Sequence, residues 1–378
     1  MMKIIVSPDS FKGTMSSLEV CDIIEKGINN IMQNVEVIKI PIADGGEGTV
    51  DAFLEAIGGE KVYVRVKGPL WDEVEAYYGI LPDGNTAIIE MASASGITLV
   101  EGRKNPLLTT TYGTGELIID ALDKGCKKII VGIGGSATND GGIGMAAALG
   151  VKFLDINEDG IDLNGGGLQH LDKIDNSCLI DGLNDCEVIA ACDVNNSLYG
   201  VNGAAYVFAP QKGADEEMVK LLDHNLKNYA GILARDLEID IQNVPGAGAA
   251  GGLGAGLVAF TGAKLQSGID IVLDTVKFDE VVSNADLVIT GEGKIDGQSL
   301  RGKVPIGISQ KASRYNVPVI AVVGAIGDEI EEVYKKGITT VFTTNLKPEP
   351  FEKAKINCKE NLLKTTESIM RLIKIFKK

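Results

Sequence analysis

The sequence predicts an α/β fold in which both ends of the chain build one doubly wound parallel sheet and the middle forms an inserted α/β domain. Two observations predict it. Short apolar runs alternate with helical segments at both chain ends, and the residues between them begin with the strand–turn–strand pattern of a hairpin. The runs that we expect to form the five parallel strands occupy residues 4–6, 35–40, 287–290, 318–323 and 340–343.

The helix after the first strand has a clear start signal. Ser16 and Glu19 have the spacing of a capping box, in which each residue bonds the backbone of the other. Val20, Ile24 and Ile28 then recur on one helical face. Further helices are predicted at residues 49–57, 306–315 and 329–335, and along the C-terminal end of the chain.

A hairpin opens the middle of the chain. Residues 73–81 and 86–91 are predicted as antiparallel strands around a Pro-Asp-Gly-Asn turn. A helix at residues 116–122, a strand at 128–131 and a polar helix near 215–233 follow. This change of pattern predicts a discontinuous domain of residues 1–65 and 283–378, with an inserted domain of residues 66–282.

Composition excludes several classes of function. Lys and Arg total 36 against 52 Asp and Glu, and the resulting net charge of −16 argues against nucleic-acid binding. The six cysteines contain no C-x-x-C pair, so we expect reduced thiols rather than a zinc site. The N-terminus has no signal-peptide pattern, and the apolar residues 245–263 are mostly Gly and Ala. We therefore expect a cytoplasmic protein with no membrane partner.

One long glycine-rich loop follows a predicted strand. Residues 132–144 read GIGGSATNDGGIG, and an Ala-rich helix is expected after them. Glycine lets backbone N–H groups approach an anion, and a following helix adds positive potential. The loop either binds phosphate or substrate or is a tight structural turn. The candidate ligand-binding residues are Gly134, Gly135, Ser136, Thr138 and Asp140.

Two nucleotide-binding signatures are absent or misleading. The G-x-x-x-x-G-K-[ST] pattern of P-loop enzymes does not occur. Residues 246–251 match G-x-G-x-x-G, but they follow Pro245 rather than a clear strand, so a dinucleotide site is not favoured.

Acidic residues recur in loops beyond strand ends, where a carboxylate is well placed to bind Mg²⁺ or a substrate hydroxyl. Lys12 lies three residues after Asp9 and adds a cation that could hold a carboxylate or a transferring phosphoryl group. With only two histidines in the chain, a histidine base is disfavoured, and phosphoryl transfer does not need one. The loop acids are Asp9, Asp44, Glu47, Asp193, Glu292 and Asp296.

Six motifs in order resemble those of the type I glycerate kinases. They are PDSFKG at residues 8–13, ADGGEGT at 43–49, GGSATNDGG at 134–142, ACDVN at 191–195, PGAGAAGG at 245–252 and GEGKIDGQ at 291–298. The resemblance implies a flavodoxin-like domain with a restriction-endonuclease-like insert. It also implies ATP-dependent phosphorylation of D-glycerate, in many members at the 2-hydroxyl group and in some at the 3-hydroxyl group.

We expect glycerate and ATP to meet in a cleft between the domains. Asp193 is the candidate base, with Asp296 as a nearly equal alternative. Lys12 would stabilise the transferring phosphoryl group or hold the glycerate carboxylate. Arg65 and Arg301 are less specific carboxylate partners, because each also fits a surface position. The residues expected at Mg²⁺, hydroxyl or phosphate groups are Asp9, Ser10, Asp44, Glu47, Glu292 and Asp296, with Glu292 and Asp296 as the metal ligands.

Two alternatives belong to other classes of function. One is an NAD(P)-dependent oxidoreductase of a small hydroxy acid, which rests on residues 246–251. The other is a non-catalytic sensor of a sugar acid or nucleotide. The sequence decides neither which hydroxyl group is phosphorylated nor the oligomeric state. A homodimer is compatible with the sequence.

Overall fold

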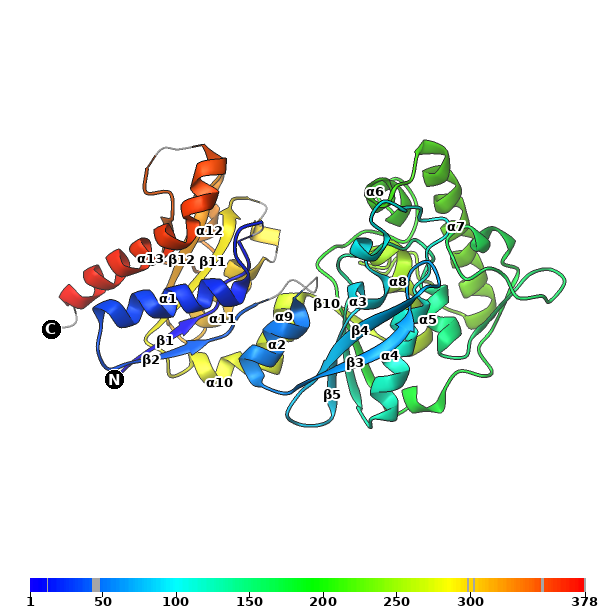
Figure 1. Ribbon diagram of the computed structural model, residues 1–378, viewed down its shortest axis with the longest axis horizontal. Helices are drawn as coiled ribbons and strands as arrows, with labels where there is room; N and C mark the ends of the chain where they lie inside the picture. Colours follow the sequence, from blue (N-terminus) through cyan, green and yellow to red (C-terminus); the bar gives the residue numbers. More distant parts are fainter. Residues whose placement is uncertain (12, 43–47, 298, 302, 348–349, 377–378) are drawn as a thin grey trace. The chain divides into compact units, whose positions relative to one another are not determined.

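Both ends of the chain contribute strands to one sheet, and the residues between them build a second one (Figure 1). The computed structural model describes residues 1–11, 13–42, 48–297, 299–301, 303–347 and 350–376. The chain divides into two units. The terminal unit comprises Met1–Asp44, Asp51–Ile57 and Ile269–Lys378, and the inserted unit comprises Gly45–Val50 and Gly58–Gly268.

The sheet of the terminal unit has five strands in the order β13-β12-β11-β1-β2, and every neighbouring pair is parallel. Counted along the chain this is the order 2-1-3-4-5 of a flavodoxin-like sheet. All five predicted strands are confirmed. They are β1 (Met2–Val6), β2 (Val35–Lys39), β11 (Leu287–Ile295), β12 (Val319–Ile326) and β13 (Thr340–Thr343).

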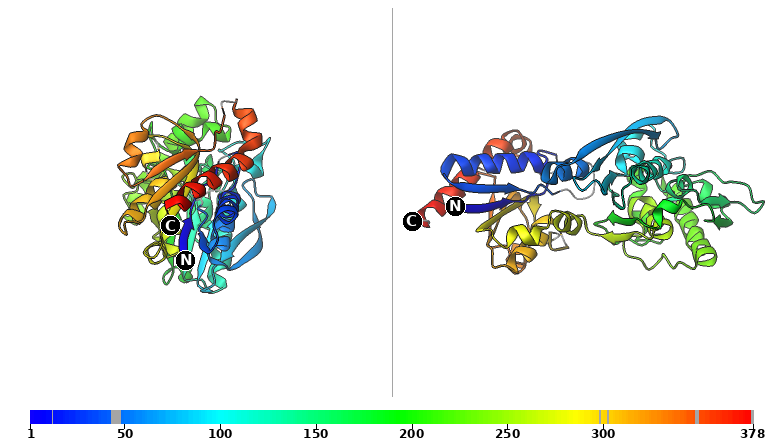
Figure 2. Two further views of the ribbon diagram at one scale, coloured as in Figure 1. Left: turned by 90° about the vertical axis from the view of Figure 1, so that its left-hand side faces the viewer. Right: turned by 90° about the horizontal axis from the view of Figure 1, so that it is seen from below.

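Helices cover both faces of this sheet, as a doubly wound fold requires (Figure 2). Helices α1 (Ser17–Ile31) and α13 (Phe351–Phe376) pack together on one face. A Cβ atom at Gly27 would lie 2.8 Å from Thr366, so glycine permits this close approach. Helix α11 (Val304–Ser313) packs against β11 and β12. The remaining helices are α2 (Thr49–Ile57), α9 (Gly268–Thr275), α10 (Phe278–Val282) and α12 (Ile330–Tyr334).

The capping box predicted for α1 is confirmed. The Glu19 backbone N–H donates to Ser16 Oγ at 3.2 Å, and the Ser16 N–H donates to Glu19 Oε2 at 2.9 Å. Val20, Ile24 and Ile28 are fully buried beneath the helix. A polar start signal and an apolar face therefore act together to place α1 on the sheet.

The sheet of the inserted unit has six strands in the order β10-β9-β6-β5-β4-β3. Its β3-β4 and β4-β5 pairs are antiparallel and the other pairs are parallel. The predicted hairpin is confirmed as β4 and β5. The strands are β3 (Glu60–Lys67), β4 (Glu73–Ile80), β5 (Thr86–Glu90), β6 (Lys128–Gly132), β9 (Glu187–Ala191) and β10 (Lys264–Gln266).

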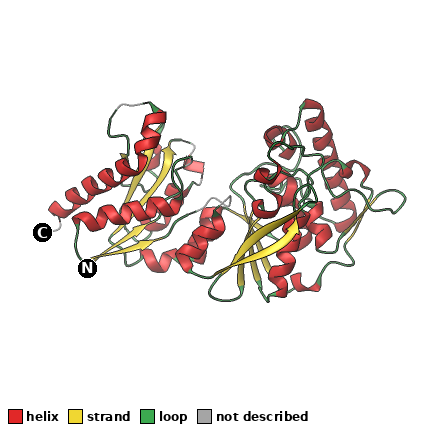
Figure 3. Ribbon diagram, viewed as in Figure 1, coloured by secondary structure: helices red, strands yellow, loops and turns green. Residues whose placement is uncertain are grey.

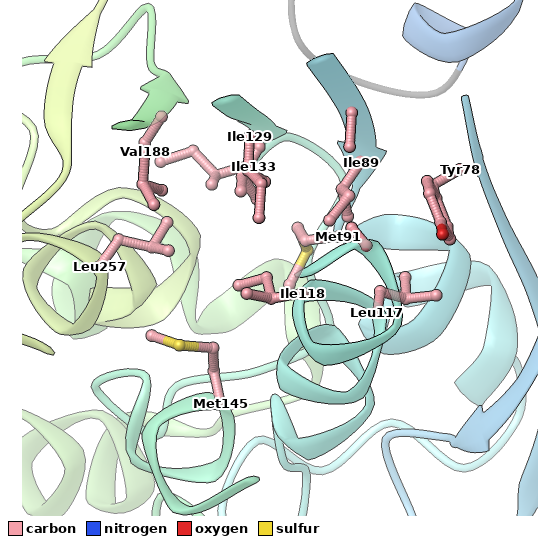
Figure 4. Close-up of a cluster of buried hydrophobic side chains, with 14 of the residues drawn as sticks. Tyr78, Ile89, Met91, Leu117, Ile118, Ile129, Ile133, Met145, Val188 and Leu257 are labelled. Atoms are coloured by element: carbon pink, nitrogen blue, oxygen red, sulfur yellow. The ribbon is translucent and has the colours of Figure 1, made fainter. Parts of the chain in front are cut away.

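Helices lie against the sheet of the inserted unit (Figure 3). Buried apolar side chains form a core between the sheet and these helices. Ile89, Ile129 and Val188 project from three neighbouring strands toward Ile118 and Leu257 on helices (Figure 4). A small antiparallel pair, β7 (Lys152–Leu154) and β8 (Lys173–Asp175), lies outside the main sheet. The helices are α3 (Ala92–Ser95), α4 (Tyr112–Asp123), α5 (Ile143–Ala148), α6 (Ala204–Phe208), α7 (Glu216–Leu237) and α8 (Ala249–Thr261).

The boundaries of the two units lie away from those expected at residues 65/66 and 282/283. Strand β3 pairs along its whole length with β4, so it belongs to the inserted unit from Gly58 onward. Helices α9 and α10 belong to the terminal unit from Ile269 onward. The pairing of β3 with β4 sets the first boundary. The alternation of apolar and polar residues in a strand does not reveal which strand it pairs with, so the sequence did not indicate this boundary.

Among the helices that the structure describes, none is long and apolar enough to cross a lipid bilayer.

Candidate active site

In the terminal unit, one predicted acid, Asp9, lies just beyond the end of β1, and a second, Glu292, lies in the C-terminal half of the adjacent strand β11. The Asp9 backbone N–H donates to Gly291 O at 2.8 Å, which brings Asp9 beside Glu292. The chain order reverses between β1 and β11, since β2 lies on one side of β1 and β11 on the other. Ligands of doubly wound folds bind outside the strand ends at such a switch point.

Glu292 is a buried carboxylate with two side-chain partners. Its exposed fraction is 4%, and it lies within β11. Ser299 Oγ donates to its Oε1 at 2.6 Å, and Lys303 Nζ donates to its Oε2 at 3.2 Å. Burial raises the pKa of Glu292, and the bonds from Ser299 and Lys303 oppose that shift. The neighbouring charge of Asp296 adds to the rise in pKa.

Asp296 belongs to the same network. Its backbone N–H donates to Ser299 Oγ at 3.2 Å, and its carboxylate forms an ion pair with Lys294 at 3.0 Å. At the end of β1, the Ser10 N–H donates to Asp9 Oδ1 at 2.6 Å. The structure therefore brings Asp9, Ser10, Glu292 and Asp296 to one edge of the terminal sheet.

The described part of the structure does not include the side chains of four other predicted residues. Lys12, Asp44 and Glu47 lie outside the described residues. Arg301 ends a short 3-10 helix, Ser299–Arg301, and its side chain is also outside the described part. Their roles stay predictions.

In the inserted unit, four parallel strands end at the same level. Glu90, Gly132, Ala191 and Gln266 are paired in register across β5, β6, β9 and β10. The loops that follow these residues therefore share one edge of the sheet. The glycine loop, defined as residues 132–144, follows β6, and Asp193 follows β9.

The glycine loop is tied down on one side. Residues 135 and 137 exchange backbone hydrogen bonds of 2.8 and 2.9 Å with residues 95–97. Gly135 has a φ of 74°, a left-handed conformation that glycine adopts without steric cost and that lets successive N–H groups converge. Within the described residues, no acceptor is found for the backbone N–H groups of Gly134, Gly135 and Ser136.

A buried lysine stands behind this loop. Lys212 is 2% exposed, and its Nζ donates to Ser136 Oγ at 2.7 Å and to Thr138 O at 2.6 Å. Burial lowers the pKa of Lys212 to about 7, and the charge of Asp140 opposes the shift. In the described part of the chain, the Thr138 hydroxyl and the Asn139 amide are buried without a hydrogen-bond partner.

Asp140 organises the second half of the glycine loop. Its fully buried carboxylate accepts bonds from Thr111 N and Oγ1, both at 2.8 Å, from Gly142 N at 3.1 Å and from Gly144 N at 3.3 Å. Burial raises the pKa of Asp140, while these hydrogen bonds act to lower it. Both carboxylate oxygens are thus engaged by the protein itself.

Asp193 and Arg65 are both exposed but differ in position. Asp193 Oδ1 accepts a hydrogen bond from the Gly268 N–H at 2.9 Å, which holds the carboxylate at the shared strand edge. Arg65 lies on the edge strand β3, opposite Glu75. Strands β4 and β5 separate β3 from β6, so the sheet does not bring Arg65 to the glycine loop.

Four polar residues at these sites were not predicted from the sequence. Ser299 and Lys303 bond Glu292, and Lys212 bonds the glycine loop, as described above. Glu90 is 2% exposed and accepts a hydrogen bond from Val50 N at 2.7 Å. The sequence could have indicated Glu90 as a candidate functional residue, because it ends an apolar strand and a charged residue is rarely buried.

The G-x-G-x-x-G pattern at residues 246–251 serves close packing of the backbone. A Cβ atom at Gly248 would lie 2.1 Å from Ser197 O, and one at Gly251 would lie 2.0 Å from Thr138 O. The pattern leads into α8 without a strand directly before it. It therefore lacks the strand–loop–helix setting of a dinucleotide site.

Among the described residues, no three His, Cys, Asp or Glu side chains gather at one metal-sized position. Mg²⁺ in phosphoryl-transfer sites is commonly held by one or two carboxylates together with substrate phosphates. Glu292 and Asp296 interact through their charges at one strand end, which fits that smaller donor set.

Comparisons with known proteins agree over the full chain. Residues 4–374 match the family described as the glycerate kinase family. Glycerate kinase of Bacillus cereus (strain ATCC 10987 / NRS 248) is 48% identical over 99% of this chain and 98% of its own length. Glycerate 2-kinase of Escherichia coli (strain K12) is 47% identical over the same shares.

A solved structure gives the same answer. A crystal structure provisionally designated glycerate kinase 2, from Salmonella typhimurium LT2, has a TM-score of 0.88 and 46% sequence identity, and all of both chains is covered. The fold, the ordered loops and these relatives lead to one assignment: this chain belongs to the glycerate kinase family.

Proposed function

We propose that this protein transfers the γ-phosphoryl group of ATP to the 2-hydroxyl group of D-glycerate, giving 2-phospho-D-glycerate. One observation carries the proposal: Asp9 and Glu292 lie side by side at the switch point of a doubly wound sheet. The relative named glycerate 2-kinase, 47% identical, supports the choice of acceptor hydroxyl.

Phosphoryl transfer depends on positioning and on charge stabilisation rather than on covalent intermediates. We assign the base role to Asp193, because its exposed carboxylate follows β9 at the shared strand edge and is oriented there by the Gly268 N–H. Asp296 is the alternative base. Lys12 would stabilise the charge on the transferring phosphoryl group or hold the glycerate carboxylate.

The glycine loop would receive an anionic group of one substrate. Support comes from the three N–H groups of residues 134–136, for which the described residues offer no acceptor. Asp140 would shape the loop rather than contact the ligand, since its fully buried carboxylate already accepts four hydrogen bonds from the protein. Arg65 fits a surface position better than a carboxylate partner.

Mg²⁺ would be held by Asp296 and Glu292 together with phosphate oxygens of ATP. The ion would neutralise charge on the phosphates and so favour their transfer. Lys303 and Ser299 orient Glu292 and oppose the rise in its pKa that burial causes, because both donate to its carboxylate.

Phosphorus NMR of the product from D-glycerate, ATP and Mg²⁺ tests this function. We expect a resonance of 2-phosphoglycerate and equimolar ADP. A resonance of 3-phosphoglycerate would keep the kinase activity and change the acceptor hydroxyl. No protein-dependent ADP would overturn the proposal.

A further inference from the structure

The glycine loop has a buried cation that neither the motifs nor the comparisons assign. Lys212 lies in a short 3-10 helix, Pro210–Lys212, and its ammonium group reaches residues 76 and 74 positions earlier in the chain. A charged lysine is rarely buried to this degree unless a partner repays its desolvation. The acceptors that Lys212 Nζ reaches within the described residues, Ser136 Oγ and Thr138 O, are both uncharged.

The position of Lys212 relative to the loop indicates its use. It anchors residues 136 and 138, directly beside the backbone N–H groups of residues 134–136 that have no acceptor within the described residues. Gly134 is half-buried and Gly135 is exposed, so this end of the loop is open to solvent. The Thr138 hydroxyl is buried without a partner in the same described region.

We propose that Lys212 is a positioning residue that holds residues 134–138 in an anion-binding conformation and supplies positive charge to that site from behind. The ligand is an oxyanion, either a phosphate of ATP or the carboxylate of glycerate. The inference rests on the proposed assignment of the glycine loop to an anionic substrate group. A buried cation acts on an anion with little screening by water, so its effect reaches beyond direct contact.

The electrostatic surroundings of Lys212 are consistent with this role. Burial lowers its pKa to about 7, so the charge at the loop changes near neutral pH. Among the described residues, the negative charge of Asp140 opposes this shift. Burial raises the pKa of the neighbouring Tyr229, and the charge of Asp140 adds to that rise. Lys104 approaches Gly213 through its backbone, and its side chain is exposed.

The test replaces Lys212 by methionine, which keeps an unbranched side chain one heavy atom shorter and removes its charge. We expect the KM for one substrate, ATP or D-glycerate, to rise about tenfold, equivalent to about 1.4 kcal/mol of binding. The substrate whose KM rises is the source of the anion. Lys220→Met, at an exposed position of α7, removes the same charge and is expected to leave both KM values unchanged.

A second variant covers the case in which Lys212→Met does not fold. Ser136→Ala keeps the ammonium group but removes one of its acceptors, and the same KM is expected to rise by a smaller factor. The pH dependence is a readout that a purely structural role would not move. Dividing kcat/KM of the wild type by kcat/KM of Lys212→Met removes the effect of substrate ionisation, which is the same for both proteins. This ratio is expected to fall as pH rises through about 7, because Lys212 loses its charge there.

Binding of ATP by calorimetry separates this inference from the proposed reaction. If the wild-type protein makes no phosphoglycerate, the proposed function fails, and weaker ATP binding in Lys212→Met still supports the role of Lys212 in anion binding. The inference is overturned if the folded Lys212→Met or Ser136→Ala protein has wild-type values of both KM and a flat pH ratio.

Discussion

The hydroxyl group of Ser299 donates a 2.6 Å hydrogen bond to the carboxylate of Glu292. The same oxygen accepts the backbone N–H of Asp296 at 3.2 Å, so one serine orients two acids of the terminal unit. Lys303 completes the arrangement at the second oxygen of Glu292. A buried carboxylate held in this way is preorganised to act on a ligand.

Replacing Glu292 by glutamine is expected to lower kcat/KM for phosphorylation of glycerate by about a hundredfold, a typical effect of losing one preorganised charged group. The fold should remain, because glutamine has the same shape. Steady-state kinetics with ATP and D-glycerate measure the effect. Glu331→Gln in α12 is the matched control, since Glu331 is exposed in the same unit and should have wild-type kinetics. Equal kinetics of the two variants would remove Glu292 from the site.

Glu292 should also affect the pH dependence of stability. Burial raises its pKa above the unfolded value of about 4.3. The folded protein binds this proton more tightly than the unfolded chain, so the contribution to stability is full below the unfolded pKa and is lost as pH rises through the folded pKa. The free energy of unfolding of the wild type, minus that of Glu292→Gln, should therefore decline from about pH 4 upward. Urea titrations at several pH values measure this difference, and an increase with pH contradicts the assigned direction.

Asp193→Asn should lower kcat by orders of magnitude, because asparagine cannot accept the proton of the substrate hydroxyl group. The hydrogen bond from Gly268 N can persist, since the asparagine side-chain oxygen is also an acceptor. Turnover and thermal unfolding are measured together. Asp185→Asn, at an exposed position before β9, should change neither quantity. Near-normal turnover of Asp193→Asn would instead direct the base role to Asp296.

Much of this architecture could be predicted from local patterns. Apolar runs and the Ser16–Glu19 capping box identified the parallel strands and α1, because each signal involves residues close in sequence. Loops after strand ends were identified for the same reason. Parallel strands then bring such loops to one edge without any further information.

The contacts that build the sites could not be predicted in this way. Lys212 and Ser136 are 76 residues apart, and Glu90 and Val50 are 40 residues apart. No periodicity links such pairs, since packing of separate elements creates them. Asp140 illustrates the same limit: its sequence position suggested a ligand contact, whereas its burial and its bonds to Thr111 tie the loop to α4.

Asp140→Asn should destabilise the inserted unit by about 1–3 kcal/mol. Four donors converge on this carboxylate, and asparagine offers them one oxygen and one NH₂ group, so at least one buried donor loses its acceptor. Urea unfolding measures the loss. The control is Asp162→Asn, at an exposed position of the same unit, which should lie within about 0.5 kcal/mol of the wild type. Equal stability of the two variants would show that Asp140 does not support the loop.

Gly251 and Gly262 form a matched pair in and after α8. Both have left-handed backbones, with φ of 67° and 65°. A Cβ atom at Gly262 meets nothing within 4 Å, whereas one at Gly251 would lie 2.0 Å from Thr138 O and 2.5 Å from Asn139 Cα. Gly262→Ala is therefore expected to lower the free energy of unfolding by about 1 kcal/mol, the cost of placing an alanine in a left-handed backbone conformation.

Gly251→Ala should cost that amount and a further 1–3 kcal/mol, roughly, for overpacking. The displaced atoms belong to the glycine loop: Thr138 O is an acceptor of Lys212, so its movement should also raise the KM that Lys212→Met raises. Gly262→Ala should leave that KM unchanged. Thermal unfolding and steady-state kinetics on both variants test the two effects separately. Equal losses of stability would show that the chain yields at Gly251, and an unchanged KM would show that the loop keeps its shape without this contact.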